Sequence, residues 1–211
     1  MASVTAVSDR AIARLPVLER LDVGLVERLR PLLETPAAQK LGKLGRLGDD
    51  SLLLLLSIGL TTAGLATRNG RLQRSGFRML VAQLVAKGAK ELGKSSVDRT
   101  RPAEQLEEGR YVARRGSSRS EALRSFPSGH TASALAVARA FSREYPSFTR
   151  PVLTAAAVVG ALQVPRRANY PGDVAAGAGA GMLAEKAADM LIAGIERVRR
   201  RRAPQAVPAP A

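Results

Sequence analysis

The chain contains uncharged, mostly aliphatic stretches that have the length of a helix and lack the alternation of a strand. Residues 52–66 form one stretch of fifteen residues without a charge, and residues 152–165 form a second. No alternation of apolar and polar residues is longer than four or five residues, which argues against half-buried strands. Because aromatic residues are only 3% of the chain, the core has to be built from Leu, Ala and Val, a composition that favours helices. The sequence therefore predicts an all-α helical bundle.

The chain is long enough for one domain with irregular ends, at 211 residues. Residues 1–48 have helical spacing and a basic face, which predicts an amphipathic basic helical arm. Residues 49–195 are expected to form the bundle, with a long last helix over residues 173–195. Residues 196–211 are predicted to form a basic, Pro/Ala-rich disordered tail.

The charge of the chain indicates an anionic partner. Thirty-three basic residues against eighteen acidic ones give a formal net charge of +15, which fits nucleic acid, phospholipid headgroups or a phosphorylated substrate. Lys40, Lys43 and Arg46 have a spacing typical of a helix on an anionic membrane surface, and equally of a solvated face. We do not expect a nucleic-acid partner, because the chain has no recognised binding module and few aromatic side chains for base stacking.

Two features of the sequence bear on a membrane location: the length of its apolar stretches and the small residues in its last helix. A bilayer span needs about 20 apolar residues, so residues 52–66 are short for one. Gly177, Gly179 and Gly181 allow close helix approach, in a membrane or in a soluble bundle. The charged residues among the first twenty argue against a cleavable signal peptide. The alternatives are a membrane-embedded bundle and a soluble bundle with a peripheral basic arm.

Two segments contain candidate phosphate-binding residues. Lys94 and Arg101 are seven residues apart, about two helical turns, so they could present two cations to one anion or belong to a solvated basic face. Ser128 and Gly129 fall where a helix begins, so a hydroxyl and free amides could point at an anion. An ordinary N-cap followed by a surface histidine explains the same residues. His130 is the only histidine, so it can serve as one acid or base and not as two.

Together with Asn169 and Asp173, these segments resemble the type 2 phosphatidic acid phosphatase family. The signature of that family is Lys-x6-Arg-Pro, then Pro-Ser-Gly-His, then Ser-Arg-x5-His-x3-Asp. The first block matches over residues 94–102 and the second over residues 127–130. The resemblance implies an all-α bundle of the phosphatidic acid phosphatase and haloperoxidase type, embedded in a membrane. It also implies hydrolysis of a lipid or polyprenyl phosphate without a metal or other cofactor.

The third block departs from the family pattern at two positions. Counting back from Asp173, Asn169 stands where the family has its nucleophilic histidine, and Gln163 stands at the position of its arginine. A carboxamide nitrogen has no available lone pair, so Asn169 cannot form a phosphohistidine. Arg167 follows Gln163 by four residues, one helical turn, and is a candidate to replace the lost charge.

The resemblance implies a role for each remaining motif residue. Lys94, Arg101, Ser128 and the Gly129 amide would bind phosphate, with Gln163 and Arg167 as further candidates at the altered position. His130 would protonate the leaving group, and Asp173 would hold the group at position 169.

These substitutions leave two functions open. One is a working phosphatase in which His130 acts with a water nucleophile that Asn169 positions. The other is a pseudophosphatase that binds phosphorylated lipid or acts as a membrane partner. Both predict a multi-pass protein of a membrane, the cytoplasmic membrane in a bacterium, in contact with an anionic membrane surface.

Overall fold

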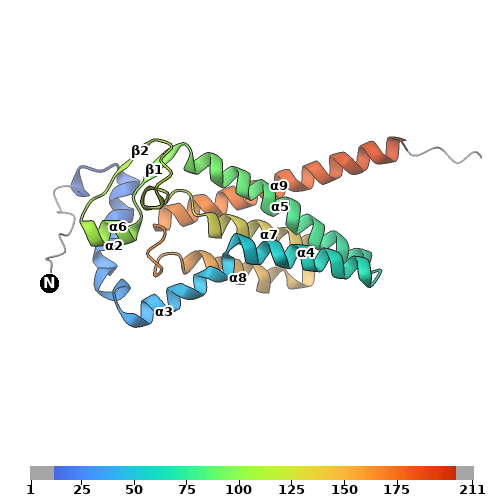
Figure 1. Ribbon diagram of the computed structural model, residues 1–211, viewed down its shortest axis with the longest axis horizontal. Coiled ribbons are helices and arrows are strands. Elements are labelled where there is room, and N and C mark those ends of the chain that lie inside the picture. Colours follow the sequence, from blue (N-terminus) through green and yellow to red (C-terminus); the bar gives the residue numbers. More distant parts are fainter. Residues whose placement is uncertain (1–11, 203–211) are drawn as a thin grey trace, which may run out of the picture.

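The computed structural model describes residues 12–202, which contain eight α-helices (Figure 1). The predicted all-α fold is confirmed. In chain order the helices are α2 (Val17–Leu33), α3 (Pro36–Leu44), α4 (Asp50–Ala66), α5 (Gly70–Lys94), α6 (Pro102–Glu108), α7 (Gly129–Glu144), α8 (Thr149–Ala161) and α9 (Pro171–Arg202).

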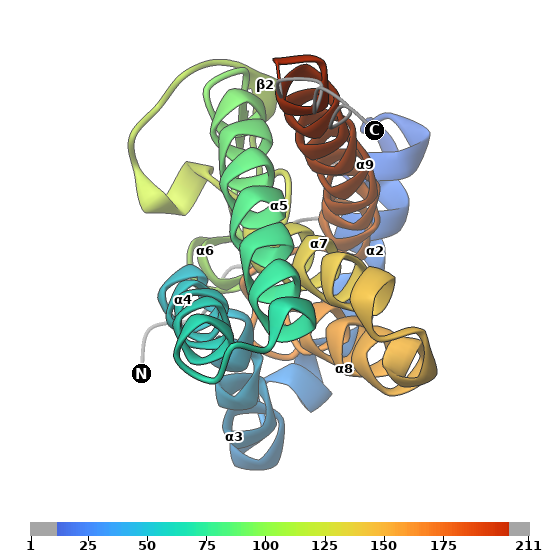
Figure 2. The same cartoon turned by 90° about the vertical axis from the view of Figure 1, so that its right-hand side faces the viewer.

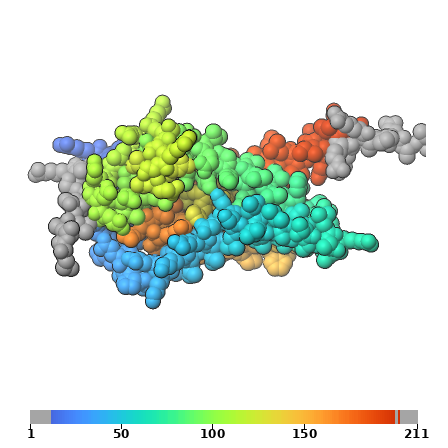
Figure 3. Space-filling view, in the orientation of Figure 1, coloured from blue at the N-terminus to red at the C-terminus, as the bar shows by residue number. Residues whose placement is uncertain are grey.

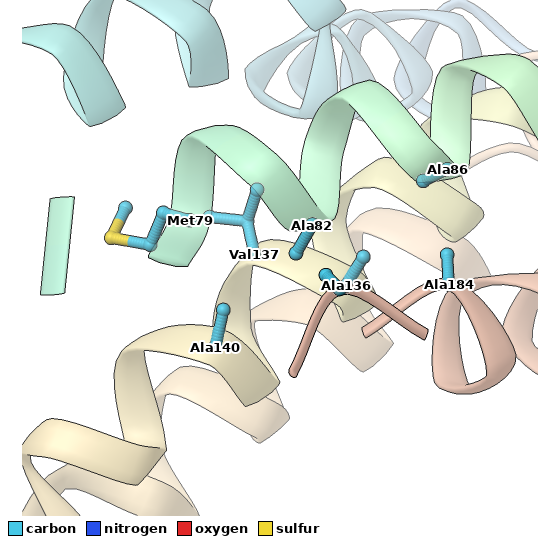
Figure 4. Packing of buried hydrophobic residues seen from close by; sticks show 8 residues of the cluster. Met79, Ala82, Ala86, Ala136, Val137, Ala140 and Ala184 are labelled. Atoms are coloured by element: carbon cyan, nitrogen blue, oxygen red, sulfur yellow. The ribbon is translucent and has the colours of Figure 1, made fainter. Parts of the chain in front are cut away.

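Helix α7 lies at the centre of the bundle. It packs against α5, α8 and α9, while α5 also packs against α4 and α9 (Figure 2). The core where α5, α7 and α9 meet is built mainly from small side chains, so the helix backbones come close together (Figure 4). Its buried members are Met79, Ala82, Ala86, Ala136, Val137, Ala140, Ala184 and Ala188.

Two glycines allow α9 to touch the backbone of α7. A Cβ at Gly181 would lie 2.5 Å from the carbonyl oxygen of Ala132, and a Cβ at Gly177 would clash with the carbonyl oxygen of Ser128. Gly179 has nothing within 4 Å of its Cβ position. Close helix approach therefore needs Gly177 and Gly181, and it fixes the start of α7 against α9.

The ends of the elements differ from the sequence-based expectations in two places. Helix α9 continues to Arg202, so residues 196–202 are helical where a disordered tail is predicted. Arginine is a good helix former and no glycine or proline interrupts this run. Residues 203–211 of the predicted tail lie outside the described residues. A small antiparallel sheet of β1 (Val97–Arg99) and β2 (Ala113–Arg115) was not predicted, because three-residue strands are too short to show alternation.

The arm packs directly on the bundle. Helix α3 leads into the 3-10 helix η1 (Gly45–Gly48) and then into α4, and this blue-to-teal segment runs from the lower left across the front of the molecule (Figure 3). A Cβ at Gly42 would lie 2.7 Å from Cα of Arg166, and one at Gly45 would lie 2.9 Å from Nε2 of Gln163. The backbone of the arm therefore rests on the segment between α8 and α9.

None of the helices within residues 12–202 is long and apolar enough to cross a bilayer alone, whereas the bent pair Pro36–Gly48 and Asp50–Ala66 passes that test jointly by length and composition.

Candidate active site

The start of α7 opens onto a polar cavity of about 270 Å³. Ser128 is the N-cap of α7, so Gly129 and His130 occupy the first turn, where backbone amides have no intrahelical acceptor. Lys94, the last residue of α5, lines the same cavity. The structure thus brings three of the predicted site residues, Lys94, Gly129 and His130, to one cavity, whose remaining lining residues are Asp49, Asp50, Ser51 and Lys90.

Cations crowd around Lys94. Burial lowers the pKa of Lys94, and the neighbouring charges of Arg101, Lys90 and Arg124 lower it further. Arg101 binds Glu121 at 2.7 Å, yet its buried Nε has no hydrogen-bond partner among residues 12–202. Among residues 12–202, no carboxylate lies within 4.0 Å of the Lys94 ammonium group. Half-buried like charges of this kind are typical of an anion-binding site.

Lys90 and Asp50 form an ion pair at the other side of the cavity. Burial alone would raise the pKa of Asp50, but hydrogen bonds from Lys90 and Ser133 lower it below its ordinary value. Asp50 is therefore an ionised carboxylate. The charge of Lys90 is balanced by the Asp50 carboxylate, whereas the charge of Lys94 has no such partner among the residues that line the cavity.

His130 has two charged neighbours on the same nitrogen. Its Nε2 lies 2.5 Å from Oδ1 of Asp49 and 3.1 Å from Nη1 of Arg166. Burial lowers the pKa of His130, Asp49 acts against this, and Arg166 adds to it. The imidazole is therefore mostly neutral at pH 7 and can donate to Asp49 or accept from Arg166, but not both at once.

Asn169 is buried, and both ends of its amide group are hydrogen-bonded. Its Nδ2 donates to the carbonyl oxygen of Ser125 at 2.5 Å, and its Oδ1 accepts from the hydroxyl of Ser128 at 3.1 Å. The Ser128 hydroxyl also lies 2.9 Å from Oγ1 of Thr131. Asn169 therefore ties the α8–α9 segment to the start of α7, an arrangement in which it joins two loops.

Among the described residues, the Asp173 carboxylate makes no hydrogen bond to Asn169. Its carboxylate accepts hydrogen bonds from Arg99, from the hydroxyl of Ser125 and, at 2.9 Å, from the amide of Tyr170. Arg99 also donates to Asp22 at 2.8 Å and lies over the ring of Tyr170, 4.4 Å from its centroid. Although burial alone would lower the pKa of Arg99, the Asp173 carboxylate raises it. Arg99 and Asp173 thus form a buried ion pair.

Gln163 and the two arginines that follow it lie in different surroundings. Gln163 is fully buried, and its Nε2 donates to the carbonyl oxygens of Gly45 at 3.1 Å and Val159 at 2.9 Å. Arg167 points to Glu107, with 3.6 Å between Nη1 and Oε1, so the structure does not bring it to the cavity. Residues 162–167 form turns and Arg167 has a φ of 57°, so the helical spacing behind the Arg167 prediction does not hold.

Arg166 is the arginine that reaches the site, through Nη1 contacts with His130 and, at 3.4 Å, with Oε1 of Gln163. Arg166, Asp49, Lys90 and Arg99 were all missed by sequence reasoning. Asp49 resembles an ordinary helix start, and Arg99 lies inside the first motif without any spacing that marks it.

A family model described as the PAP2 superfamily matches residues 75–188, from α5 into α9. Among solved structures, LpxE of Aquifex aeolicus has a similar fold, with a TM-score of 0.54 and 22% sequence identity. That similarity covers 80% of this chain and 94% of the LpxE chain, and at this identity it supports the fold alone. No curated protein matches the chain.

Proposed function

Because the chain belongs to the PAP2 superfamily, we propose that it binds the phosphate group of a phosphorylated lipid or polyprenyl phosphate and lacks the covalent half of the phosphatase reaction. The observation that carries this proposal is the pair of contacts made by Asn169. Both ends of its amide are hydrogen-bonded, to Ser125 and Ser128, and an amide nitrogen cannot attack phosphorus. Loss of a nucleophile in a well-studied catalytic triad costs on the order of a million-fold in kcat.

The phosphate-binding half is supported by the charges around Lys94. A phosphate in the cavity would neutralise the Lys94 ammonium group and could accept from the free amide of Gly129 at the start of α7. Arg101 is a candidate second cation, because its buried Nε lacks a partner within the part of the chain that the structure describes.

The lipid part of the proposal is supported by a groove next to the cavity. It has a volume of about 620 Å³, lies between α4 and the α7–α8 pair, and is lined almost wholly by aliphatic side chains. Gly48 lines this groove, and its Cβ position is 3.6 Å from Cβ of His130. A ligand with a phosphate at one end and an apolar chain at the other fits this combination.

The proposed location is a membrane with an anionic surface. Helix α4 exposes Leu52, Leu55 and Leu56, and α9 exposes Leu183 and Met190. Exposed apolar area on this scale is typical of a membrane or partner contact. The sequence-based expectation of a multi-pass arrangement remains part of this proposal.

The test compares wild type with the Gln163→Arg, Asn169→His double variant and with His130→Ala, each purified free of host phosphatases. We expect wild type to bind phosphatidic acid vesicles without releasing phosphate, and the double variant to release it. Two results would refute the pseudophosphatase hypothesis. The first is a folded double variant that releases no phosphate, and the second is wild-type hydrolysis that disappears in His130→Ala. The second result would instead establish the alternative, hydrolysis by water, which the Asp49–His130 contact favours as a source of acid–base chemistry.

A further inference from the structure

We propose that Arg166 supplies the guanidinium group that the phosphate site lacks at Gln163, an inference that rests on the proposed phosphate-binding function. Arg166 Nη1 lies 3.4 Å from Oε1 of Gln163, so its charge sits at the tip of the shorter glutamine side chain. The same nitrogen lies 3.1 Å from Nε2 of His130, which lines the phosphate cavity. Arg166 therefore places a cation next to His130, a residue of the cavity lining.

Arg166 is a partly buried cation whose charge is not balanced by an ion pair within the described part of the chain. Burial lowers its pKa, and the charges of Arg46 and Arg101 lower it further against the effect of Asp49. Its two hydrogen-bond partners, His130 and Gln163, are neutral side chains. Within the described part of the chain no carboxylate lies within 4.0 Å of its nitrogens. A partly desolvated cation without an ion pair is costly, and a bound phosphate would remove that cost.

The backbone around Arg166 is held in place by the arm. Because a Cβ at Gly42 would lie 2.7 Å from Cα of Arg166, α3 packs directly on this residue. Gln163, three residues earlier, is fixed by its hydrogen bond to Gly45. The guanidinium is thus presented from a fixed backbone, whereas its side chain is only partly buried and can turn toward a ligand.

Arg167 provides a matched control. It is the next residue, has the same charge and is also partly buried, but it pairs with Glu107 outside the cavity. Replacing either arginine lowers the net charge equally, so general attraction to an anionic surface changes by the same amount in both variants.

The experiment measures binding of the full chain to phosphatidylcholine vesicles that contain phosphatidic acid, a phosphomonoester, or phosphatidylglycerol, a phosphodiester, together with inorganic phosphate by calorimetry. We expect Arg166→Ala to weaken binding to phosphatidic acid by roughly ten-fold to a hundred-fold, as for loss of a charge-assisted hydrogen bond. Arg167→Ala should stay within about two-fold of wild type, like a surface charge. If Arg166→Ala loses affinity for inorganic phosphate to the same extent, Arg166 recognises the phosphate group alone. If it loses affinity only for the vesicles, recognition requires the rest of the lipid as well.

Rescue separates a direct role from a structural one. The Gln163→Arg, Arg166→Ala double variant should recover binding, because it returns the guanidinium to the family position. If the alanine variant does not fold, Arg166→Gln tests the same loss of charge in a side chain that keeps hydrogen-bonding capacity. Equal binding by wild type and both Arg166 variants, or no recovery in the double variant, would overturn the inference about Arg166. A wild type that does not distinguish phosphatidic acid from phosphatidylglycerol would instead overturn the proposed function.

Discussion

The buried ion pair of Arg99 and Asp173 predicts that Arg99→Met lowers the thermal stability of the chain. The side chains of Arg99 and Asp173 are 7% and 0% exposed, and Asp22, the second carboxylate on Arg99, is 12% exposed. Methionine matches the length of the arginine stem but leaves two buried carboxylates without a cation.

The expected loss follows from the cost of an unpaired buried charge. Removing one partner of a buried ion pair costs about 3–5 kcal/mol. In a chain of this size each kcal/mol shifts the melting temperature by about 2–4 °C, so Arg99→Met should lower it by roughly 6–20 °C. The deficit should shrink as the pH falls, because burial raises the pKa of Asp173 and its protonated carboxyl group no longer needs the cation.

The assay is thermal unfolding followed by circular dichroism at pH 7 and at acid pH. Arg167→Met is the control, since Arg167 pairs with Glu107 at 3.6 Å and Glu107 is 62% exposed. Such a surface pair contributes about 0–1 kcal/mol, so the control should melt within a few degrees of wild type. An Arg99→Met variant that melts as the control does, or a deficit that ignores pH, would refute the reasoning.

Two further predictions concern packing and the cation of the cavity. Gly177→Ala should destabilise the chain by about 1–3 kcal/mol, because the new Cβ meets the backbone at the start of α7. Gly179→Ala is the control and should be neutral or stabilising by up to about 1 kcal/mol. Equal melting temperatures for the two variants would contradict the close α7–α9 contact. Lys94→Met should raise the melting temperature at pH 7 while weakening phosphate binding, because burial lowers the pKa of Lys94 and so disfavours its charged form. That gain should disappear well above pH 10.5, where the lysine is neutral in the folded and unfolded chain alike, and a gain that persists there would have another cause.

Much of the fold could be predicted from the sequence because its helices are marked locally. The uncharged residues 52–66 lie within α4 and the small residues after Asp173 lie within α9. The sheet of β1 and β2 was not predictable in this way, because it consists of three-residue strands whose pairing depends on the segment between them, which includes α6.

The candidate site was predictable only where its residues form a pattern along the chain. Lys94, Gly129 and His130 belong to such patterns, and they line one cavity. The contact between Asp49 and His130 joins residues 81 positions apart, and only the packing of α4 beside α7 brings them together. The choice between Arg166 and Arg167 depends on the left-handed backbone of Arg167, which helical spacing cannot reveal.

The glycines of the arm also decide where this protein can be divided. Gly42 and Gly45 rest on Arg166 and Gln163, and Gly48 lies beside His130. The division between residues 48 and 49 therefore separates Gly48, which lines the apolar groove, from Asp49, which lines the polar cavity, and a fragment that begins at Asp49 would lose part of the groove wall. The arm and the bundle have to be expressed, mutated and compared as one unit.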